Sequence, residues 1–452
     1  MISSIAHIYA TPFESSEKPL SCKINPANFL LEEIPTYGVY CFEFGAHQNL
    51  ADVITNVRHF SWNRSISGQL LNNLSDSLQL DSPITVPLNY NLPDELVLNQ
   101  LENNDISIPA KVIDEFHDKL SRAVQVRCGN HHNVCRKCFA RYVKHNERTN
   151  GSDFSYSSDS ENEMRTGPLN TINGITFREC NHASTAILFS GGIDSTVLAL
   201  LANKFVPAHL PIDLLNVAFN NEAPDRETGL RAWEELLVLC PHRKWNFVSI
   251  HISKEELETY RSKHIRFLVK PSQTVLDDSI GCAVWFATRG KGLLMQEPGE
   301  ITSFTCQTRA RVVLLGMGAD EQLGGYSRHR KVYLNHGWSG LLAEMTTDVE
   351  RISSRNLGRD DRVTADHGIE ARFPFLDELV INYLNGLPIW YKCNLNLERS
   401  KGEKLLLRLL AHRLGLHVTS QHLKRAIQFG SRIAKLEERT EKGDNICSRL
   451  SC

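Results

Sequence analysis

The sequence predicts an α/β fold, a doubly wound parallel sheet with a helical C-terminal part. Short apolar runs of strand length alternate with segments of helical periodicity between residues 185 and 290. Two such runs end in glycine-rich turns, at residues 190–192 and 316–318. Glycines of this kind are typical of the sheet edge at which open α/β folds bind their ligands. Beyond about residue 331 the pattern is mostly helical, and we expect that region to cap the site.

The expected elements follow in chain order. Apolar residues recur at helical spacing over residues 109–124, which predicts an amphipathic helix packed against the sheet. The apolar run 185–189 predicts a buried strand that leads into a helix over residues 196–202. Taken alone, residues 370–377 indicate a turn into a helix that Asp377 caps. Further strands are expected at residues 214–219, 245–250 and 312–315, and further helices at residues 254–269 and 276–287.

The segment 190–195 reads Ser-Gly-Gly-Ile-Asp-Ser and lies where the first strand passes into its helix. The first N–H groups of a helix lack intrahelical partners, and the positive end of the helix dipole favours an anion. Two glycines allow the backbone to approach phosphate oxygens closely, and two serines add hydroxyl donors. Asp194 cannot bind phosphate directly, so it predicts a divalent cation, most commonly Mg²⁺, between carboxylate and phosphate. A lone Gly-Gly turn would instead indicate a plain strand–turn–helix.

A second segment repeats this design. Residues 312–315 suit a central parallel strand, and Gly316 and Gly318 open its carboxyl end. Asp320 follows and can hold the same metal ion from the side opposite Asp194. The sequence contains no G-x-x-x-x-G-K-[ST] motif, which removes the main support for a kinase or GTPase.

Three motifs in this order resemble the synthetase half of the asparagine synthetases: SGGIDS at residues 190–195, GMGADEQLGGY at residues 316–326 and EARFPFLD at residues 370–377. The first is similar to the PP-loop of ATP pyrophosphatases, which cleave ATP between the α and β phosphates. A narrower resemblance, to a divergent branch of the family, rests on residues 275–287, 351–363 and 428–435. The match therefore covers residues 181 to about 435, the PP-loop part of the chain.

The resemblance implies a reaction in two steps that uses ATP and Mg²⁺. The β-carboxylate of aspartate attacks the α-phosphorus to give β-aspartyl-AMP and pyrophosphate. Ammonia, free or derived from glutamine, then displaces AMP and leaves asparagine. Preorganised cations and N–H donors should carry most of the first step, because it concentrates negative charge.

The resemblance also assigns roles to residues. Lys404 and Arg362 are the expected catalytic groups, and Asp194 and Asp320 are expected to hold Mg²⁺ through the pyrophosphate. Without the resemblance, Lys404 fits a solvated helix face, and Arg362 fits a surface ion pair with a neighbouring aspartate, Asp360 or Asp361. The residues expected to bind the nucleotide are Leu188, Ser190, Gly191, Gly192, Asp194, Ser195, Gly316 and Gly318.

One departure from the family pattern lies between the two glycines of the second motif. The asparagine synthetases have an acid there, suited to accepting a proton from ammonia, whereas this chain has Met317. The residues expected for the adenylation step are present, whereas the amidation step lacks the usual general base. Glu321 or Glu370 could take its place. The alternatives are a different nucleophile, or a catalytically inactive binding or scaffold protein that keeps the synthetase fold.

A larger departure concerns the N-terminus. Glutamine amidotransferases of this family begin with a cysteine nucleophile, whereas this chain begins Met1-Ile2, so we expect no such nucleophile. Residues 33–44 resemble the closing strands of a glutaminase domain. The expected divisions are a truncated, β-rich glutaminase-like remnant at 1–95, a helix with a basic Cys/His insertion at 96–148, a disordered linker at 149–180, the PP-loop synthetase domain at 181–440 and a flexible tail at 441–452.

The Cys/His insertion contains Cys128, His131, Cys135 and Cys138, with C-x-x-H and C-x-x-C spacings. Four such ligands can hold Zn²⁺ tetrahedrally. The spacing is more compact than in most zinc sites, which favours loop thiols in a basic insertion. A cysteine pair with a basic arm also fits a third function, a PP-loop enzyme that adenylates and modifies tRNA. The second and third motifs argue against that function, because such enzymes do not share them.

Composition predicts a cytoplasmic globular enzyme. The chain has 452 residues, of which 41% are hydrophobic and 23% charged, with a formal net charge of -2. That balance gives no general electrostatic footprint for nucleic acid, and no apolar stretch has the length of a membrane span. Its 12 cysteines fit reduced thiols. The expected partners are small-molecule substrates, and the oligomeric state stays open.

Overall fold

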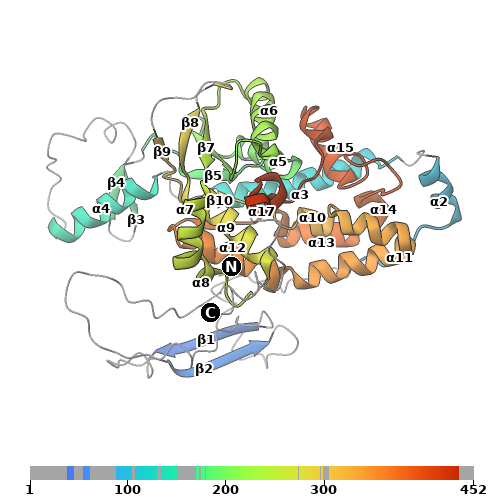
Figure 1. Cartoon of the computed structure of the whole chain (residues 1–452), viewed down its shortest axis with the longest axis horizontal. Coiled ribbons are helices and arrows are strands. Elements are labelled where there is room, and N and C mark those ends of the chain that lie inside the picture. The colour runs from blue at the N-terminus through green and yellow to red at the C-terminus, as the bar shows by residue number, and fades with distance from the viewer. Residues whose placement is uncertain are drawn as a thin grey trace.

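The computed structural model describes residues 38–44, 54–61, 88–103, 107–129, 134–149, 169–172, 175–178, 180–272, 274–295, 297–298 and 305–436. Its centre is a seven-stranded sheet in the order β11-β10-β5-β6-β7-β8-β9 (Figure 1). Five strands are parallel: β11 (Glu370–Arg372), β10 (Val312–Leu314), β5 (Thr185–Leu188), β6 (Ile212–Ala218) and β7 (Trp245–His251). Strands β8 (Lys291–Met295) and β9 (Thr305–Gln307) extend the β7 edge in antiparallel pairing.

The strand order reverses between β5 and β10. From β5 the chain moves outward through β6 to β7, and it later returns to the other side of β5 to add β10 and β11. Val312 and Val313 pair in parallel register with Thr185 and Ala186. The connections from these two strands leave in opposite directions, which opens a crevice at their carboxyl ends. Both glycine-rich motifs follow these strands, so the sheet topology places them at one edge.

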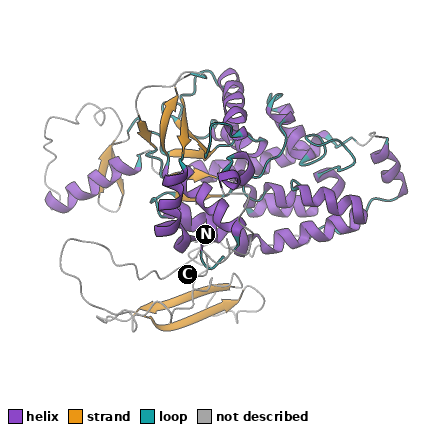
Figure 2. Ribbon diagram, in the orientation of Figure 1, coloured by secondary structure: helices purple, strands orange, loops and turns teal. Residues whose placement is uncertain are grey.

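Alternating residues of the central strands feed two separate cores. Ile187 and Leu214 face a core built with α3 (Ala110–Gly129), α5 (Ile193–Ala202) and α6 (Pro224–Leu239). Their neighbours Ala186 and Leu215 face a second core, with α9 (Val275–Arg289) and α12 (Gly358–Ala365). Successive side chains of a strand point to opposite faces, so helices cover both sides of the sheet. Figure 2 shows the strands between these helices.

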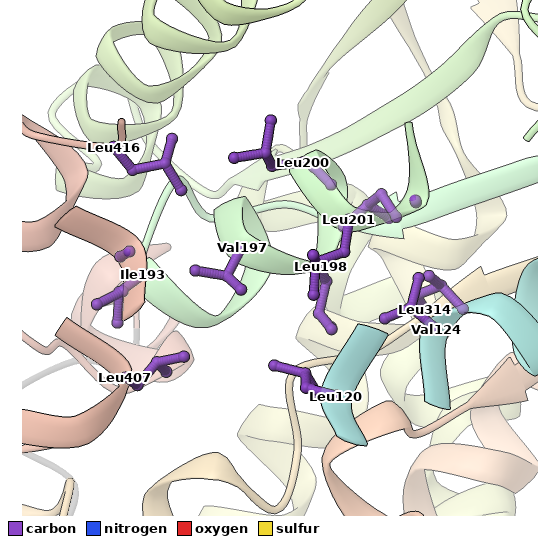
Figure 3. Packing of buried hydrophobic residues seen from close by; sticks show 14 of the residues in the cluster. Leu120, Val124, Ile193, Val197, Leu198, Leu200, Leu201, Leu314, Leu407 and Leu416 are labelled. Atoms are coloured by element: carbon purple, nitrogen blue, oxygen red, sulfur yellow. The ribbon is translucent and has the colours of Figure 1, made fainter. Parts of the chain in front are cut away.

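Beyond its polar first turn, helix α5 is apolar on every side and is surrounded by other elements. Its Val197 and Leu198 lie between Leu120 of α3 and Leu407 of α15 (Leu405–Arg413), as Figure 3 shows. A helix that is hydrophobic all round is typical of burial on all faces. This packing fixes the N-terminus of α5 at the carboxyl edge of the sheet.

The C-terminal part is helical, as expected. Helix α11 (Ser327–Ile352) packs with α14 (Ile389–Lys392) and α2 (Glu95–Glu102) through Trp338, Ile389 and Leu101. Asp377 caps α13 (Glu378–Gly386), accepting a hydrogen bond from the Leu379 amide at 3.0 Å. The remaining helical segments are α4 (Arg136–Thr149), α7 (Lys254–Tyr260), a π-helical turn (Arg261–Ile265), α8 (Arg266–Val269), α10 (Ala319–Gln322), a second π-helical turn (Ser353–Leu357), 3-10 turns (Pro374–Leu376 and Thr419–Gln421), α16 (Ile427–Gly430) and α17 (Ile433–Leu436).

The doubly wound parallel sheet is confirmed, and several elements were not expected. β8, β9 and β11 are strands of three to five residues, too short for a periodic signal. β3 (Leu169–Ile172) and β4 (Ile175–Arg178) form an antiparallel hairpin, so the disorder predicted for 149–180 does not hold for them. The described part of the chain contains no helix long and apolar enough to cross a membrane.

Near the N-terminus, β1 (Gly38–Phe44) and β2 (Ile54–Ser61) pair as an antiparallel hairpin that joins no other sheet. The glutaminase-like remnant remains a prediction. His131 and the tail at 441–452 lie outside the described residues.

Candidate active site

A cavity of about 290 Å³ lies at the carboxyl ends of β5, β6 and β10. One part of its wall is apolar and includes Leu188, Val217 and Met317. The facing part is charged and includes Asp194 and Asp320. An apolar slot beside clustered charges suits a ligand with a flat ring at one end and ionised groups at the other.

The loop between β5 and α5 has the conformation of an anion cradle. Gly191 has a φ of +74°, and a Cβ there would lie 2.3 Å from the carbonyl oxygen of Thr228. No other residue type fits this position without displacing the backbone. Ser195 Oγ donates to the Gly192 carbonyl at 3.1 Å, and the Gly192 amide donates to Ser190 Oγ at 3.2 Å. The loop is therefore held rigidly in front of the first turn of α5.

Lys404 joins the two predicted metal-binding acids. Its Nζ lies 2.6 Å from Asp194 Oδ2 and 2.8 Å from Asp320 Oδ1, and its side chain is 1% exposed. Lys424 contacts the other oxygen, Asp320 Oδ2, at 2.6 Å. A Cβ at Gly325 would lie 2.0 Å from Asp320 Oδ1 and 2.4 Å from Lys404 Cε, so glycine is required there. The interpretation of Lys404 as part of a solvated helix face is wrong, because the acids draw its side chain inward.

Lys404 begins α15 with a φ of +54°, in the left-handed region that side chains rarely adopt. Such strain persists only where the surrounding contacts determine it, and it is common at functional sites. Here the backbone amide donates to the Leu323 carbonyl at 3.0 Å, which ties the start of α15 to the second motif.

The charges of this group determine how it titrates. Asp194 and Asp320 raise the pKa of Lys404 despite its burial, so the ammonium stays protonated. Burial raises the pKa of Asp194, and Lys404 opposes that effect only in part. Burial acts in the same direction on Asp320, but Lys404 and Lys424 outweigh it and hold its pKa below the usual range. Asp194 therefore accepts a proton more readily than Asp320.

The two acids also fit a hard divalent cation. Their carboxylates meet at a single cation position, now filled by the Lys404 ammonium. Asp320 Oδ1 is buried and accepts no well-directed hydrogen bond, although that ammonium is near. Carboxylate oxygens that converge in this way, beside a cradle for phosphate, are ligands that Mg²⁺ prefers.

A second polar group lies deeper in the pocket, around Glu321. Glu321 Oε1 accepts hydrogen bonds from Tyr326 Oη at 2.5 Å and Asn356 Nδ2 at 2.6 Å, and Oε2 accepts from the Gly318 amide at 3.2 Å. Burial raises the pKa of this carboxyl group, and Asp320 adds to the effect. Asn356 and Lys424 were missed from the sequence, since no local motif marks them, and Tyr326 ends the second motif but was given no role there.

Two residues expected at the site are elsewhere. Arg362 Nε donates to the Leu268 carbonyl at 2.7 Å, and its guanidinium also donates to the Val269 carbonyl at 3.3 Å. It does not line the pocket. Glu370 lies at the amino end of β11, paired with Arg372 at 2.9 Å, and does not line the pocket either. Their expected roles at the site therefore remain predictions, which the positions of the two side chains do not support.

The neighbouring Arg359 does line the pocket. It is buried and pairs with Asp277 at 2.7 Å and Asp360 at 2.9 Å. Of the residues expected to bind nucleotide, Leu188, Ser190, Asp194, Ser195 and Gly316 line the pocket, while Gly191, Gly192 and Gly318 shape the two loops beside it.

The cysteines of the predicted insertion do not form the expected loop. Cys128 is buried within α3, where burial raises its pKa to about 12. Cys135 precedes α4 and Cys138 lies in its first turn, both buried together with Cys180. Among the described residues, Cys135 and Cys138 therefore group with Cys180, whereas Cys128 lies in a different core. The predicted ligand set that includes Cys128 and His131 stays a prediction, because His131 lies outside the described residues.

Comparison with known proteins supports the resemblance. The profile of the asparagine synthase family matches residues 181–339 and 333–441. The chain is 51% identical over 311 residues to asparagine synthetase domain-containing protein 1 of Homo sapiens, covering 59% of this chain and 48% of that protein. A Drosophila melanogaster asparagine synthetase domain-containing protein, CG17486, is 42% identical over 285 residues, with the same coverage of 59% and 48%. The chain thus spans about half the length of the curated relatives it matches.

A more distant relative has a name that states an activity. The putative asparagine synthetase [glutamine-hydrolyzing] 1 of Methanocaldococcus jannaschii is 30% identical over 206 residues, covering 46% of this chain and 33% of that protein. The narrower resemblance, which rested on residues 275–287, 351–363 and 428–435, is confirmed by the identity to domain-containing protein 1.

Proposed function

The chain belongs to the asparagine synthase family, and from that premise we propose that it is an ATP-dependent ligase that activates a carboxylate by adenylation. The observation that carries the proposal is the convergence of Asp194 and Asp320 on one cation position beside the 190–195 loop. Kinases and GTPases use other phosphate loops, and the sequence has none of them. The cavity provides both an apolar slot and the charged wall that ATP requires.

The first step is attack of a carboxylate oxygen on the α-phosphorus, with pyrophosphate as the leaving group. The 190–195 loop and the N-terminus of α5 would bind the departing phosphates through N–H groups. Lys404 and Lys424 supply two ammonium groups at the same edge. Bound Mg²⁺, held by Asp194 and Asp320, would neutralise charge on the pyrophosphate. Lys404 would then turn from the acids toward the phosphates.

The proposed acceptor is the β-carboxylate of aspartate, and the product of the second step is asparagine. Ammonia adds to the acyl carbon of β-aspartyl-AMP, AMP leaves with the oxygen that came from aspartate, and a proton must be removed from nitrogen. Glu321 is the candidate base, since its carboxyl group lines the pocket and burial raises its pKa. Met317 lines the same cavity and cannot take that proton.

The experiment follows pyrophosphate release from MgATP by the full chain, with and without aspartate and ammonium. We expect release that depends on aspartate, and a loss of at least about a hundredfold in Asp194→Asn, the usual scale for a group that stabilises transition-state charge. Asp213→Asn is the matched control. Asp213 is also buried, but it bonds Thr308 and Asn246 and does not line the cavity. Its activity should equal that of the unmodified chain.

Isotope transfer identifies the bond that breaks. Aspartate labelled with heavy oxygen in its β-carboxylate should deliver one labelled oxygen to AMP, because that oxygen bridges carbon and phosphorus in the intermediate. Unlabelled AMP together with pyrophosphate release would indicate attack by water and would reject the ligase. Binding of ATP without pyrophosphate release, whatever amino acid is offered, would favour the inactive scaffold that Met317 motivates.

A further inference from the structure

Four side chains with soft metal-binding atoms meet at the edge of the sheet remote from the nucleotide pocket. Cys135, Cys138, Cys180 and His182 each offer one such atom, and these atoms all lie within 4.8 Å of one another. The three cysteine side chains are between 0% and 2% exposed. Cys135 and Cys180 are 45 residues apart in the chain, so folding alone brings the group together.

The spacing of these atoms is that of a tetrahedral zinc site. With Zn–S bonds of about 2.3 Å and a Zn–N bond of about 2.0 Å, tetrahedral angles place sulfur ligands about 3.8 Å apart and sulfur and nitrogen about 3.5 Å apart. Cys138 Sγ lies 3.6 Å from His182 Nδ1. Three buried thiols within 4.8 Å of one another gain little stability from their mutual contact alone, whereas a shared ion would bind all of them. We propose that Cys135, Cys138, Cys180 and His182 bind one structural Zn²⁺ ion.

Backbone donors already point at the proposed ligands. The Cys135 amide donates to Cys180 Sγ at 3.2 Å, and the Cys138 amide donates to Cys135 Sγ at 3.5 Å. Such N–H groups stabilise thiolates and orient them toward a metal. Cys135 and Cys138 also lie at the N-terminus of α4, whose positive end favours thiolate.

The histidine imposes one adjustment. Arg309 donates to Nε2 of His182. Metal binding through Nδ1 leaves the ring proton on Nε2, so the half-buried Arg309 guanidinium must then move away from that atom. Its positive charge stays close to a site in which three thiolates and Zn²⁺ leave one negative charge.

The surrounding core is too small to hold this region by apolar contact. Its buried members are Val134, Tyr142 and the three cysteines, so most of them are proposed ligands. The group joins the start of α4 to the segment that leads into β5, and the Arg136 amide extends the junction to the Arg309 carbonyl at 2.9 Å, just before β10. Both strands begin here and end at the pocket. Four protein ligands close the site, which indicates a structural role and not a catalytic one.

The test measures metal in the full chain, expressed with zinc and purified under reducing conditions. We expect about one zinc per chain, as in other closed four-ligand sites, and intense visible bands of tetrahedral, thiolate-bound metal after replacement by Co²⁺. In competition with a chelator, Cys180→Ala and His182→Ala should show an affinity for zinc at least about tenfold lower than that of the unmodified chain. His182→Cys, which supplies a thiolate in place of the imidazole, should keep the metal.

Cys128→Ala is the matched control, because Cys128 is equally buried and completes the other conceivable ligand set. It should keep its zinc. Equal zinc loss in Cys128→Ala and Cys180→Ala would overturn the proposal. Two results on the unmodified chain would also overturn it. One is a zinc content below about a tenth of an ion per chain, where a closed four-ligand site should hold one. The other is a mass spectrum that shows a Cys135–Cys138 disulfide. These wild-type measurements decide the matter even where a variant fails to fold.

Discussion

Lys404 and Asp194 are 210 residues apart in the chain, yet the Lys404 ammonium lies 2.7 and 2.6 Å from the two carboxylate oxygens of Asp194. With Asp320 on its other side, the lysine neutralises two acids in a pocket wall that water scarcely reaches. The contact links the PP-loop to the helical C-terminal part, so the stability of the fold and the chemistry of the pocket depend on one side chain.

Removing that ammonium should therefore affect both properties. Lys404→Met leaves the carboxylate of Asp194 uncompensated and that of Asp320 with Lys424 alone. We expect the free energy of unfolding to fall by about 3 kcal/mol and pyrophosphate release to disappear. Urea unfolding and the pyrophosphate assay measure the two effects. Lys401→Met is the control, because Lys401 is 65% exposed and pairs only with Glu398 at the surface. Equal stability of the two variants would contradict the buried role of Lys404.

Asp225 should make stability depend on pH. Burial raises its pKa to about 7, although Arg425 and Lys424 oppose the shift. The folded chain keeps this proton up to that pH, whereas the unfolded chain loses it near pH 4, so the unfolding free energy should fall as pH rises between these values. Asp225→Asn removes the effect, which is at most about 1.4 kcal/mol per pH unit.

Urea unfolding at pH 5 and pH 8 measures this contribution. Asp225→Asn should exceed the unmodified chain in stability by a clearly larger margin at pH 8 than at pH 5, because the effect accumulates from about pH 4 to about pH 7. Asp118→Asn, at a side chain that is 80% exposed, should change neither value. A difference that is the same at both pH values would rule out titration of Asp225 as its cause.

Arg362 separates a structural role from a catalytic one. Its guanidinium donates to the Leu268 and Val269 carbonyls, so Arg362→Gln should lower the unfolding free energy by about 1 to 3 kcal/mol through unpaired buried groups. The KM for ATP and the kcat of the folded variant should stay the same. A loss of kcat of about a hundredfold is typical when a group that stabilises transition-state charge is removed. Such a loss without a change in the unfolding free energy would restore the catalytic role expected from the sequence.

Met317 offers a test of the proposed second step. Met317→Glu places a carboxylate in the cavity, where it can accept a proton from the attacking ammonia. We expect asparagine formed per pyrophosphate released to increase at least about tenfold, within the usual range for a general base. Met317→Gln has the same shape without the basic group and should show no gain. Equal ratios for the two variants would show that proton removal does not limit amidation.

The sequence identified those features whose signals are local. The 190–195 loop, Asp320 and the cap at Asp377 each stand in a short pattern with one structural meaning, and the sheet followed from strand and helix lengths. Arg359 and Arg362 show the limit of this approach. They are three residues apart on one helix, about 60° around its axis, and both are buried, so only tertiary packing determines which one reaches the pocket.

Contacts between segments far apart in the chain were the second kind of feature that the sequence did not reveal. Lys424 reaches Asp320, and Asn356 reaches Glu321, only because distant segments fold together at the carboxyl edge of the sheet. The C-x-x-C pair at Cys135 pointed to metal binding, but its complement is Cys180-x-His182, at the end of a segment that was expected to be disordered. A two-residue spacing has too little information to be recognised before the structure shows what lies opposite.

The reversal of strand order at β5 and β10 makes the pocket a late product of synthesis on the ribosome. The phosphate loop leaves the ribosome early, but its two acids receive their cations only after Lys404 and Lys424 have emerged. A nascent chain, or one that a protease has cut between α13 and α15, would carry the recognition motif without a competent pocket. Such a copy would hold both acids without the two ammonium groups that neutralise them in the complete fold.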